Sequence, residues 1–153
     1  MNQSKSNYGK PSRTVLEIVR YFSLFISKIF FRIEFVNKEH IPNDLDGGLI
    51  VSSNHPTYFD PFWICIPIKR EMRFLAWDEA FDIFFVGRLL KLVGAFPISL
   101  KRSGTVKALK ESLRFLREGK TLIVFPEGER EYSDGKLLPF KTGAIRMALE
   151  TDV

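Results

Sequence analysis

The chain has 153 residues, 45% of them hydrophobic and 27% charged, which is enough for one globular domain and excludes a disordered or collagen-like protein. A single cysteine, Cys65, excludes an internal disulfide framework and fits a reducing compartment. The net charge of +5 arises within residues 1–33, so the body is neutral, which argues against nucleic-acid binding and indicates an anionic partner near the N-terminus.

Residues 1–13 are polar and contain Gly9 and Pro11, which predicts a disordered leader. Residues 14–33 follow with the period of an amphipathic helix. One half of its wheel is polar and the other apolar, the two sets being Glu17, Arg20, Ser23, Ser27, Lys28 and Arg32 against Ile18, Phe22, Phe25, Ile26 and Ile29.

A basic amphipathic helix of this kind can lie in the headgroup layer of a bilayer, where its cations meet anionic lipid. Residues 14–33 are therefore expected to associate with a membrane surface, and the alternative is a terminal helix packed on the core. The chain has no run of about 18 uncharged apolar residues that would span a bilayer. Charges interrupt the apolar stretch, which disfavours a signal peptide.

Residues 34–153 have the pattern of an α/β domain. Short apolar runs predict strands at 49–53, 72–77, 95–100 and 121–125. The clearest helix is predicted at 105–118, with Ser103 as its N-cap and Gly119 as its C-terminal stop. Alternating strands and helices favour a mostly parallel sheet covered by helices.

Three polar clusters each follow a predicted strand: NHPTYFD at 54–60, KRSG at 101–104 and PEGER at 126–130. The carboxyl ends of parallel strands share one edge of a sheet, where open α/β proteins bind their ligands. If the strands are parallel, the clusters meet at this edge, and the chemistry is expected there.

His55 and Asp60 are the candidates for proton transfer. A carboxylate that holds one nitrogen of a neutral imidazole leaves the other nitrogen to take a proton. The two residues are five positions apart, so a turn between them is required for contact. The alternative is structural, because Asp60 followed by Pro61 also suits the start of a helix and His55 suits a turn.

Lys101, Arg102 and Arg130 are candidates for binding a phosphate, and Gly128 lets main-chain donors approach it. Glu127 is expected to accept a hydrogen bond from a substrate hydroxyl or to hold Arg130. The alternatives are a solvated Lys-Arg pair and a surface Glu–Arg salt bridge. No metal site is predicted, because His55, Asp60 and Glu127 include only one histidine. The other histidine, in a turn-rich segment at position 40, is assigned to the surface.

These residues resemble a known family. Asn54-His55 with Asp60 resembles the H-x4-D motif of the glycerolipid acyltransferases, the group of 1-acyl-glycerol-3-phosphate acyltransferases. Residues 125–130 resemble their F-P-E-G-x-R block. The segments MRFLAWDEAF, GAFPI and PFKTGA, at 72–81, 94–98 and 139–144, are also similar, so the resemblance runs from about residue 36 to the end.

The resemblance implies acyl transfer, in phospholipid biosynthesis, from acyl-CoA or an acyl carrier protein to the free hydroxyl of a lysophospholipid. His55 is then the general base and Asp60 its orienting acid. Arg130, Lys101 and Arg102 hold the phosphate of the acceptor, and Glu127 and Gly128 shape its site. The resemblance also implies that the enzyme needs no cofactor beyond the thioester co-substrate and forms no acyl-enzyme on Cys65. The protein is then expected on the cytoplasmic face of a membrane.

The sequence also departs from the family pattern. Leu100 stands where the second block commonly has arginine, and Glu129 where the third block often has threonine. The family pattern continues beyond Val153 with a strand and a further block, so the domain is expected to be truncated at its C-terminus. Two alternatives therefore stay open: an acyltransferase with another acceptor, such as glycerol phosphate or a lyso-aminolipid, and a catalytically incompetent membrane-binding fragment.

Overall fold

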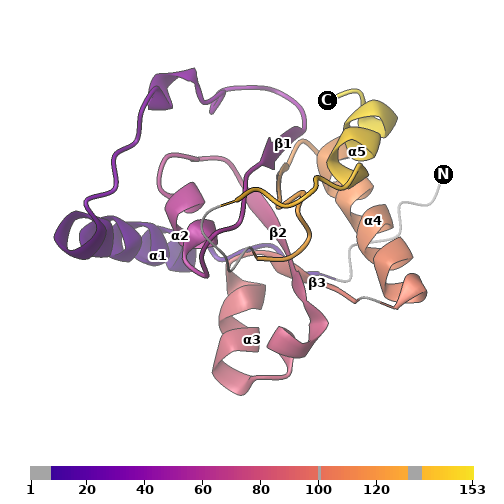
Figure 1. Ribbon diagram of the computed structural model, residues 1–153, viewed down its shortest axis with the longest axis horizontal. Helices are drawn as coiled ribbons and strands as arrows, with labels where there is room; N and C mark the ends of the chain where they lie inside the picture. Colours follow the sequence, from indigo (N-terminus) through magenta and orange to yellow (C-terminus); the bar gives the residue numbers. More distant parts are fainter. Residues whose placement is uncertain (1–7, 100, 131–135) are drawn as a thin grey trace.

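The computed structural model describes residues 8–99, 101–130 and 136–153 (Figure 1). The strands are β1 (Leu49–Ser52), β2 (Met72–Trp77), β3 (Ala95–Ile98) and β4 (Thr121–Val124). The α-helices are α1 (Arg13–Ile26), α2 (Asp60–Cys65), α3 (Phe84–Leu92), α4 (Arg102–Arg117) and α5 (Gly143–Thr151). Shorter elements are the π-helix η1 (Ser27–Phe31) and the 3₁₀-helices η2 (Lys38–His40) and η3 (Asp78–Phe81).

The strands form one parallel sheet in the order β1-β4-β2-β3. β4 lies between β1 and β2, and Thr121 pairs with Leu49 on one side and Met72 on the other. The carboxyl ends of the strands therefore lie at one edge of the sheet. The prediction of an α/β fold with a parallel sheet is confirmed, although three of the four strands end one or two residues before the predicted position.

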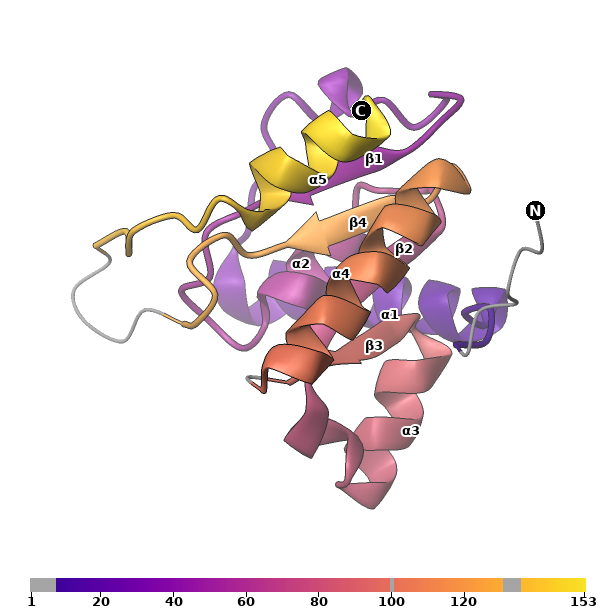
Figure 2. The same ribbon diagram turned by 90° about the vertical axis from the view of Figure 1, so that its right-hand side faces the viewer.

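Helices cover both faces of the sheet (Figure 2). α4 and α5 lie on one face, α1 and α2 lie on the other, and α3 lies beyond the β3 edge. Buried side chains fill both interfaces. Those on the side of α4 and α5 are Phe96, Ala108, Leu113, Phe115, Leu116, Leu122, Val124 and Met147. Those on the side of α2 are Cys65, Ile68, Met72, Phe74, Ala95 and Ile123.

Helix α4 ends as predicted but begins earlier. Gly119 adopts a positive φ of 75°, and the N–H groups of Gly119 and Lys120 donate to the carbonyls of Leu116 and Phe115, which closes the helix in a Schellman motif. The prediction of Ser103 as N-cap is wrong. The Lys101 carbonyl already accepts the first helical hydrogen bond, from the N–H of Thr105, so Ser103 lies inside the first turn.

Residues 8–12, at the end of the leader predicted at 1–13, contact the domain, and the disorder of the leader stays a prediction. The Tyr8 ring packs against Phe96, with ring centroids 5.8 Å apart, and Pro11 is buried. The Gly9 carbonyl accepts a hydrogen bond from Arg73, a cation buried in the sheet. These contacts hold residues 8–12 against the domain. Residues 1–7 lie outside the described part of the chain.

The helix predicted at 14–33 is present as α1 and η1, and it turns its apolar face away from the domain. Ser27 is 1% exposed and Ser23 is also buried, whereas Phe22 is 64% exposed and Phe25 is exposed as well. Packing on the core would have buried the opposite set. Among the described residues, none of the helices combines the length and the apolar character that crossing a bilayer requires.

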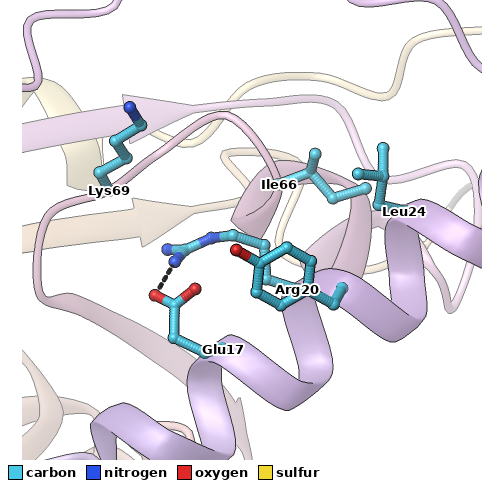
Figure 3. A pocket seen from close by; sticks show the side chains of 6 residues that line it. Glu17, Arg20, Leu24, Ile66 and Lys69 are labelled. Atoms are coloured by element: carbon cyan, nitrogen blue, oxygen red, sulfur yellow. Dashed lines mark hydrogen bonds and ion pairs between the residues drawn. The ribbon is translucent and has the colours of Figure 1, made fainter.

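Arg20 holds the inward face of α1 (Figure 3). Its Nε donates to the Cys65 carbonyl at 2.9 Å, its Nη2 donates to the Ile68 carbonyl at 2.6 Å, and its Nη1 donates to the Glu17 carboxylate. The last carbonyls of a helix carry partial negative charge, so a guanidinium is favourable at the end of α2. Arg20 therefore ties α1 to α2, the helix whose first residue is Asp60.

Candidate active site

Two of the three predicted polar clusters meet at the carboxyl edge of the sheet. β1 leads into His55 and β4 leads into Glu127. Because β1 and β4 are neighbours, their pairing continues beyond the strands, and the Ser53 N–H donates to the Val124 carbonyl at 3.1 Å. The third cluster begins at Lys101 after β3, which β2 separates from β4.

His55 and Asp60 meet through their side chains. His55 Nδ1 lies 2.8 Å from Asp60 Oδ2, and both side chains are largely buried. The required turn occupies residues 58 and 59, after which α2 begins at Asp60 with Pro61 as its second residue. Asp60 therefore starts a helix and also orients the imidazole. With Nδ1–H donating to the carboxylate, the lone pair for accepting a proton is on Nε2.

Thr57 holds the other side of the Asp60 carboxylate. Its main-chain N–H donates to Oδ2 at 2.9 Å, and its hydroxyl donates to Oδ1 at 2.6 Å. The same hydroxyl accepts a hydrogen bond from the N–H of Phe59. Both carboxylate oxygens are thus fixed before α2 begins. Thr57 was not among the predicted site residues, although Thr-x-x-Asp before an apolar run is a capping-box pattern, in which the acid accepts the main-chain N–H of the threonine.

Glu127 is 2% exposed, and main-chain donors occupy both its carboxylate oxygens. The N–H of His55 donates to Oε1 at 3.0 Å, and the N–H of Leu138 donates to Oε2 at 2.9 Å. Glu127 therefore joins the segment after β1 to the segment before α5. The expectation that it would hold Arg130 or accept a substrate hydroxyl had not included these two partners, which are 72 and 11 residues away in the chain.

Phe125 fixes the plane of the imidazole. Its ring stacks on His55 with centroids 3.9 Å apart and an interplanar angle of 15°. The stacked phenylalanine and the hydrogen bond to Asp60 together restrict both the tilt and the rotation of the His55 ring. The sequence offered only a weak signal for this role, because an aromatic residue at the end of an apolar strand is ordinarily part of the core.

Cationic groups surround the turn at Gly128. Gly128 has a positive φ of 76°, and a Cβ there would lie 2.4 Å from Lys141 Nζ, so glycine provides both the turn and the room for the ammonium. The Arg130 guanidinium lies over the ring of Tyr58, 3.0 Å from its centroid. Tyr58 belongs to the first cluster, so Arg130 lies beside the segment that carries His55. Lys141 was not among the predicted site residues.

Lys101 is exposed and directly precedes α4. Lys101 follows β3, which is two strands away from β4 in the sheet and hence about 10 Å from the strand that leads to Glu127. Its role in phosphate binding stays a prediction. Leu100 and the side chain of Arg102 lie outside the described part of the structure, so the predictions made for them stay predictions.

The remaining candidates lie outside this cluster. His40 is exposed in η2. Cys65 is buried, and burial raises the pKa of its thiol to about 12 despite the opposing charge of Arg20. Such a thiol carries almost no thiolate at neutral pH. Within the described ranges, no three His, Cys, Asp or Glu side chains are grouped to ligate one metal ion.

Two hollows in the described part of the chain lie away from His55. One of about 260 Å³ is beside the Arg20 anchor and is lined by Glu17, Arg20, Tyr21, Leu24, Ile66 and Lys69 (Figure 3). The other, of about 560 Å³, is mostly apolar and runs along β1 between η2 and α2. Neither is lined by Asp60, Glu127 or Arg130.

Known proteins are similar to this chain in sequence and in structure. The model of the family described as Acyltransferase matches residues 32–153. A solved structure from Thermotoga maritima, titled as the 1-acyl-sn-glycerophosphate (LPA) acyltransferase PlsC, is similar with a TM-score of 0.71 and 29% identity. The match covers 90% of this chain and 53% of that one.

Similar sequences include several proteins named 1-acyl-sn-glycerol-3-phosphate acyltransferase. The Bacillus subtilis protein is 29% identical over 73% of this chain, and the chloroplastic LPAT1 of Arabidopsis thaliana is 28% identical over 88%. The human beta form is 33% identical over 68%. The chain spans about half or less of the length of these relatives, namely 54%, 39% and 38%.

Proposed function

Because the chain belongs to the acyltransferase family, we propose that it transfers a fatty acyl group from acyl-CoA or an acyl carrier protein to the free hydroxyl of a lysophospholipid, 1-acyl-glycerol-3-phosphate. The observation that carries the proposal is the 2.8 Å contact between His55 Nδ1 and Asp60 Oδ2 at the carboxyl edge of a parallel sheet. The names of the relatives support the choice of acceptor.

In the proposed reaction, His55 Nε2 takes the proton of the acceptor hydroxyl as its oxygen attacks the thioester carbonyl. The new C–O bond forms, the C–S bond breaks, and the imidazolium returns the proton to the departing thiolate. General-base catalysis of this kind contributes about 10²- to 10⁴-fold. A thioester is already activated, so no acyl-enzyme is needed, and the buried, protonated Cys65 is poorly suited to form one.

The phosphate of the acceptor is proposed to bind at the turn after β4. Arg130 lies there with its guanidinium stacked on Tyr58, and the ammonium of Lys141 lies against Gly128. An arginine held in a fixed plane suits two-point recognition of a phosphate. Lys101 and Arg102 are proposed as further phosphate ligands from the neighbouring cluster.

Glu127 is proposed as a positioning residue rather than a substrate ligand. Both its oxygens already accept main-chain N–H groups and the side chain is 2% exposed, so a substrate hydroxyl has little access to the remaining lone pairs. By holding the N–H of His55, Glu127 fixes the backbone from which the base projects. By holding the N–H of Leu138, it ties the segment before α5 to the turn that presents Gly128 and Arg130.

The protein is proposed to work at a membrane surface on the cytoplasmic side. α1 exposes Ile18, Phe22 and Phe25, whereas its serines are buried against the domain. Such an outward apolar face is costly in water and favourable at the boundary of headgroups and acyl chains. The basic charge of residues 1–33 would add attraction to anionic lipid. A lysophospholipid acceptor would be taken from the same surface.

Turnover of a radiolabelled acyl thioester with lysophosphatidate in mixed micelles tests the reaction, with acyl-CoA and acyl carrier protein as separate donors. His55→Ala is expected to lose at least about 10²-fold in rate while keeping its fold by circular dichroism. His40→Ala is the matched control, because it removes the other histidine, which is exposed in η2. Equal turnover by wild type and His55→Ala would reject the proposed base.

The same assay separates the two alternatives. Glycerol 3-phosphate and a phosphate-free lyso-aminolipid, offered in place of lysophosphatidate, identify an enzyme with another acceptor. Binding to anionic vesicles without turnover of any acceptor would instead identify a catalytically incompetent membrane-binding protein. In either case vesicle binding should weaken as salt is raised, because the charge of residues 1–33 is screened.

A further inference from the structure

Helix α3 turns an apolar face outward, as α1 does. Phe84 is 72% exposed and Phe85 is 81% exposed. Val86, Leu89 and Leu92 are exposed as well, and Ile83 precedes them at the start of the helix. Phe85, Leu89 and Leu92 follow the spacing that places side chains on one side of a helix. A nine-residue helix thus presents a continuous bulky apolar surface.

The rotation of α3 is set by close packing on its inner side. A Cβ on Gly87 would lie 2.2 Å from the Phe81 carbonyl oxygen, so this glycine lets α3 contact η3 directly. Leu90 and Phe81 pack on the core cluster beneath. Because the inner face is fixed by Gly87 and Leu90, the phenylalanines cannot turn inward without breaking these contacts.

The end of α3 adjoins the start of α1. The N–H of Ser12 donates to the Leu92 carbonyl at 2.8 Å, and Pro11 lies against Gly94. The two helices with exposed apolar faces are therefore direct neighbours on the domain. Figure 2 shows both helices away from the face that α4 and α5 cover. Apolar surfaces of this extent are uncommon on soluble monomers and mark contacts with lipid or protein.

We propose that residues 83–86, at the start of α3, insert into the same lipid surface as α1 and form a second membrane contact. This inference rests on the membrane association proposed above for α1. A single helix lying on a bilayer leaves the domain free to roll about the helix axis, whereas a second contact away from that axis stops the rolling. The two contacts together would therefore fix how the His55 edge of the sheet faces the lipid.

A bilayer suits this surface better than a charged partner does. The segment 78–92 carries three acidic side chains, Asp78, Glu79 and Asp82, and two basic ones, Arg88 and Lys91. Its contribution to binding is therefore apolar and insensitive to salt, unlike that of residues 1–33. The bulky residues also form a protruding helix start rather than a groove, which suits insertion between lipid headgroups.

Site-specific fluorescence on the full chain tests the proposal. Cysteines are introduced singly by Phe85→Cys, Phe22→Cys and Leu149→Cys and labelled with an environment-sensitive dye, while the buried Cys65 stays protonated. Leu149 is the matched control, because it is 79% exposed on α5, on the opposite face of the sheet. With phosphatidylcholine vesicles containing phosphatidylglycerol, the dyes at 85 and 22 should shift to the blue and the dye at 149 should not.

Each other outcome has a defined meaning. A shift at 22 without one at 85 overturns the second contact and leaves the membrane role of α1 standing, whereas no shift at either position overturns both. A shift at position 149 would show that α5 also contacts lipid, which contradicts the assignment of the membrane surface to α1 and α3. A shift at 85 that appears without vesicles as protein concentration rises identifies a second copy as the occupant and also overturns the proposal.

A second measurement avoids the label. Phe84→Ser with Phe85→Ser should lower the vesicle partition coefficient by about tenfold or more, from the transfer free energy of a phenylalanine side chain. The loss should be the same at low and high salt, and Leu149→Ser should leave partition unchanged. Unchanged partition of the double variant would overturn the proposal.

Discussion

Glu127 accepts a hydrogen bond from the main-chain N–H of His55 at 3.0 Å, across 72 residues of the chain. The buried carboxylate thus connects the backbone of the candidate base to the turn that carries Arg130. The two sequence blocks that indicated the family are therefore parts of one hydrogen-bonded unit rather than two separate sites.

Replacement of Glu127 tests this unit. Glu127→Gln keeps one acceptor oxygen and turns the other into a donor that faces a main-chain N–H, so one buried N–H loses its partner. We expect a loss of about 1–3 kcal/mol in the free energy of unfolding and a loss of turnover. Urea unfolding and the acyl-transfer assay measure the two effects. Glu129→Gln is the control, because its side chain is exposed on the same turn. Equal stability and turnover of both variants would contradict the positioning role.

Thr57 is predicted to position Asp60 through its hydroxyl. Thr57→Val keeps the shape and the main-chain N–H but removes the hydrogen bond to Asp60 Oδ1, while Thr57→Ser retains it. Hydrogen bonds to charged groups contribute about 1.5–3 kcal/mol, so Thr57→Val should lower kcat by about tenfold to a hundredfold with little change in KM for the thioester. Thr57→Ser should restore most of the rate. A serine variant as slow as the valine variant would show that the hydroxyl is not the cause.

Cys65 is predicted to be unreactive in the folded protein. Burial raises the pKa of its thiol to about 12, so at pH 8 the thiolate fraction is lower than that of an ordinary cysteine by roughly three orders of magnitude. Mass spectrometry should detect alkylation by iodoacetamide in denaturant but very little in the native protein. Cys65→Ala should keep its acyl-transfer activity if no acyl-thiol intermediate forms. Rapid native alkylation would contradict the burial of this thiol.

Glu71 makes the free energy of unfolding depend on pH in the acid range. Burial alone would raise the pKa of its carboxyl, but hydrogen bonds from Lys120 and Arg73, together with their charges, lower it below the ordinary value of a glutamate. The folded state therefore favours the ionised form, and this stability is present above the unfolded pKa and is lost as pH falls through the folded pKa.

Glu71→Gln should thus lower the free energy of unfolding at pH 7 by up to about 1 kcal/mol, the range of partly exposed ion pairs. The difference from wild type should shrink as pH falls into the acid range. Urea unfolding at several pH values measures it, with Glu39→Gln, an exposed glutamate in η2, as the control for one lost charge. A difference that stays constant with pH would contradict the ionic origin.

Local features of the sequence were sufficient for the four strands, for α1 and α4, and for naming His55 and Asp60 as candidates. Apolar runs between turn residues gave the strands close to their observed bounds, and Gly119 marked the end of α4 because a positive φ suits glycine. His55 and Asp60 were named as a pair because an imidazole and a carboxylate five residues apart can meet across a turn. The ends of elements were less well predicted, as Ser103 shows, because they depend on how a strand leads into the next helix.

Only the tertiary structure decided which parts meet and which faces point outward. The strand order β1-β4-β2-β3 makes the segments after β1 and β4 neighbours and leaves Lys101 two strands away, and no local pattern encodes this order. The helical period showed that α1 has two faces, but the contacts of Arg20 with the end of α2 determined that the serines face the domain and the phenylalanines face outward. Side-chain periodicity is a property of neighbouring residues, whereas register, strand order and the facing of a helix are settled by free energies of contact between segments far apart in the chain.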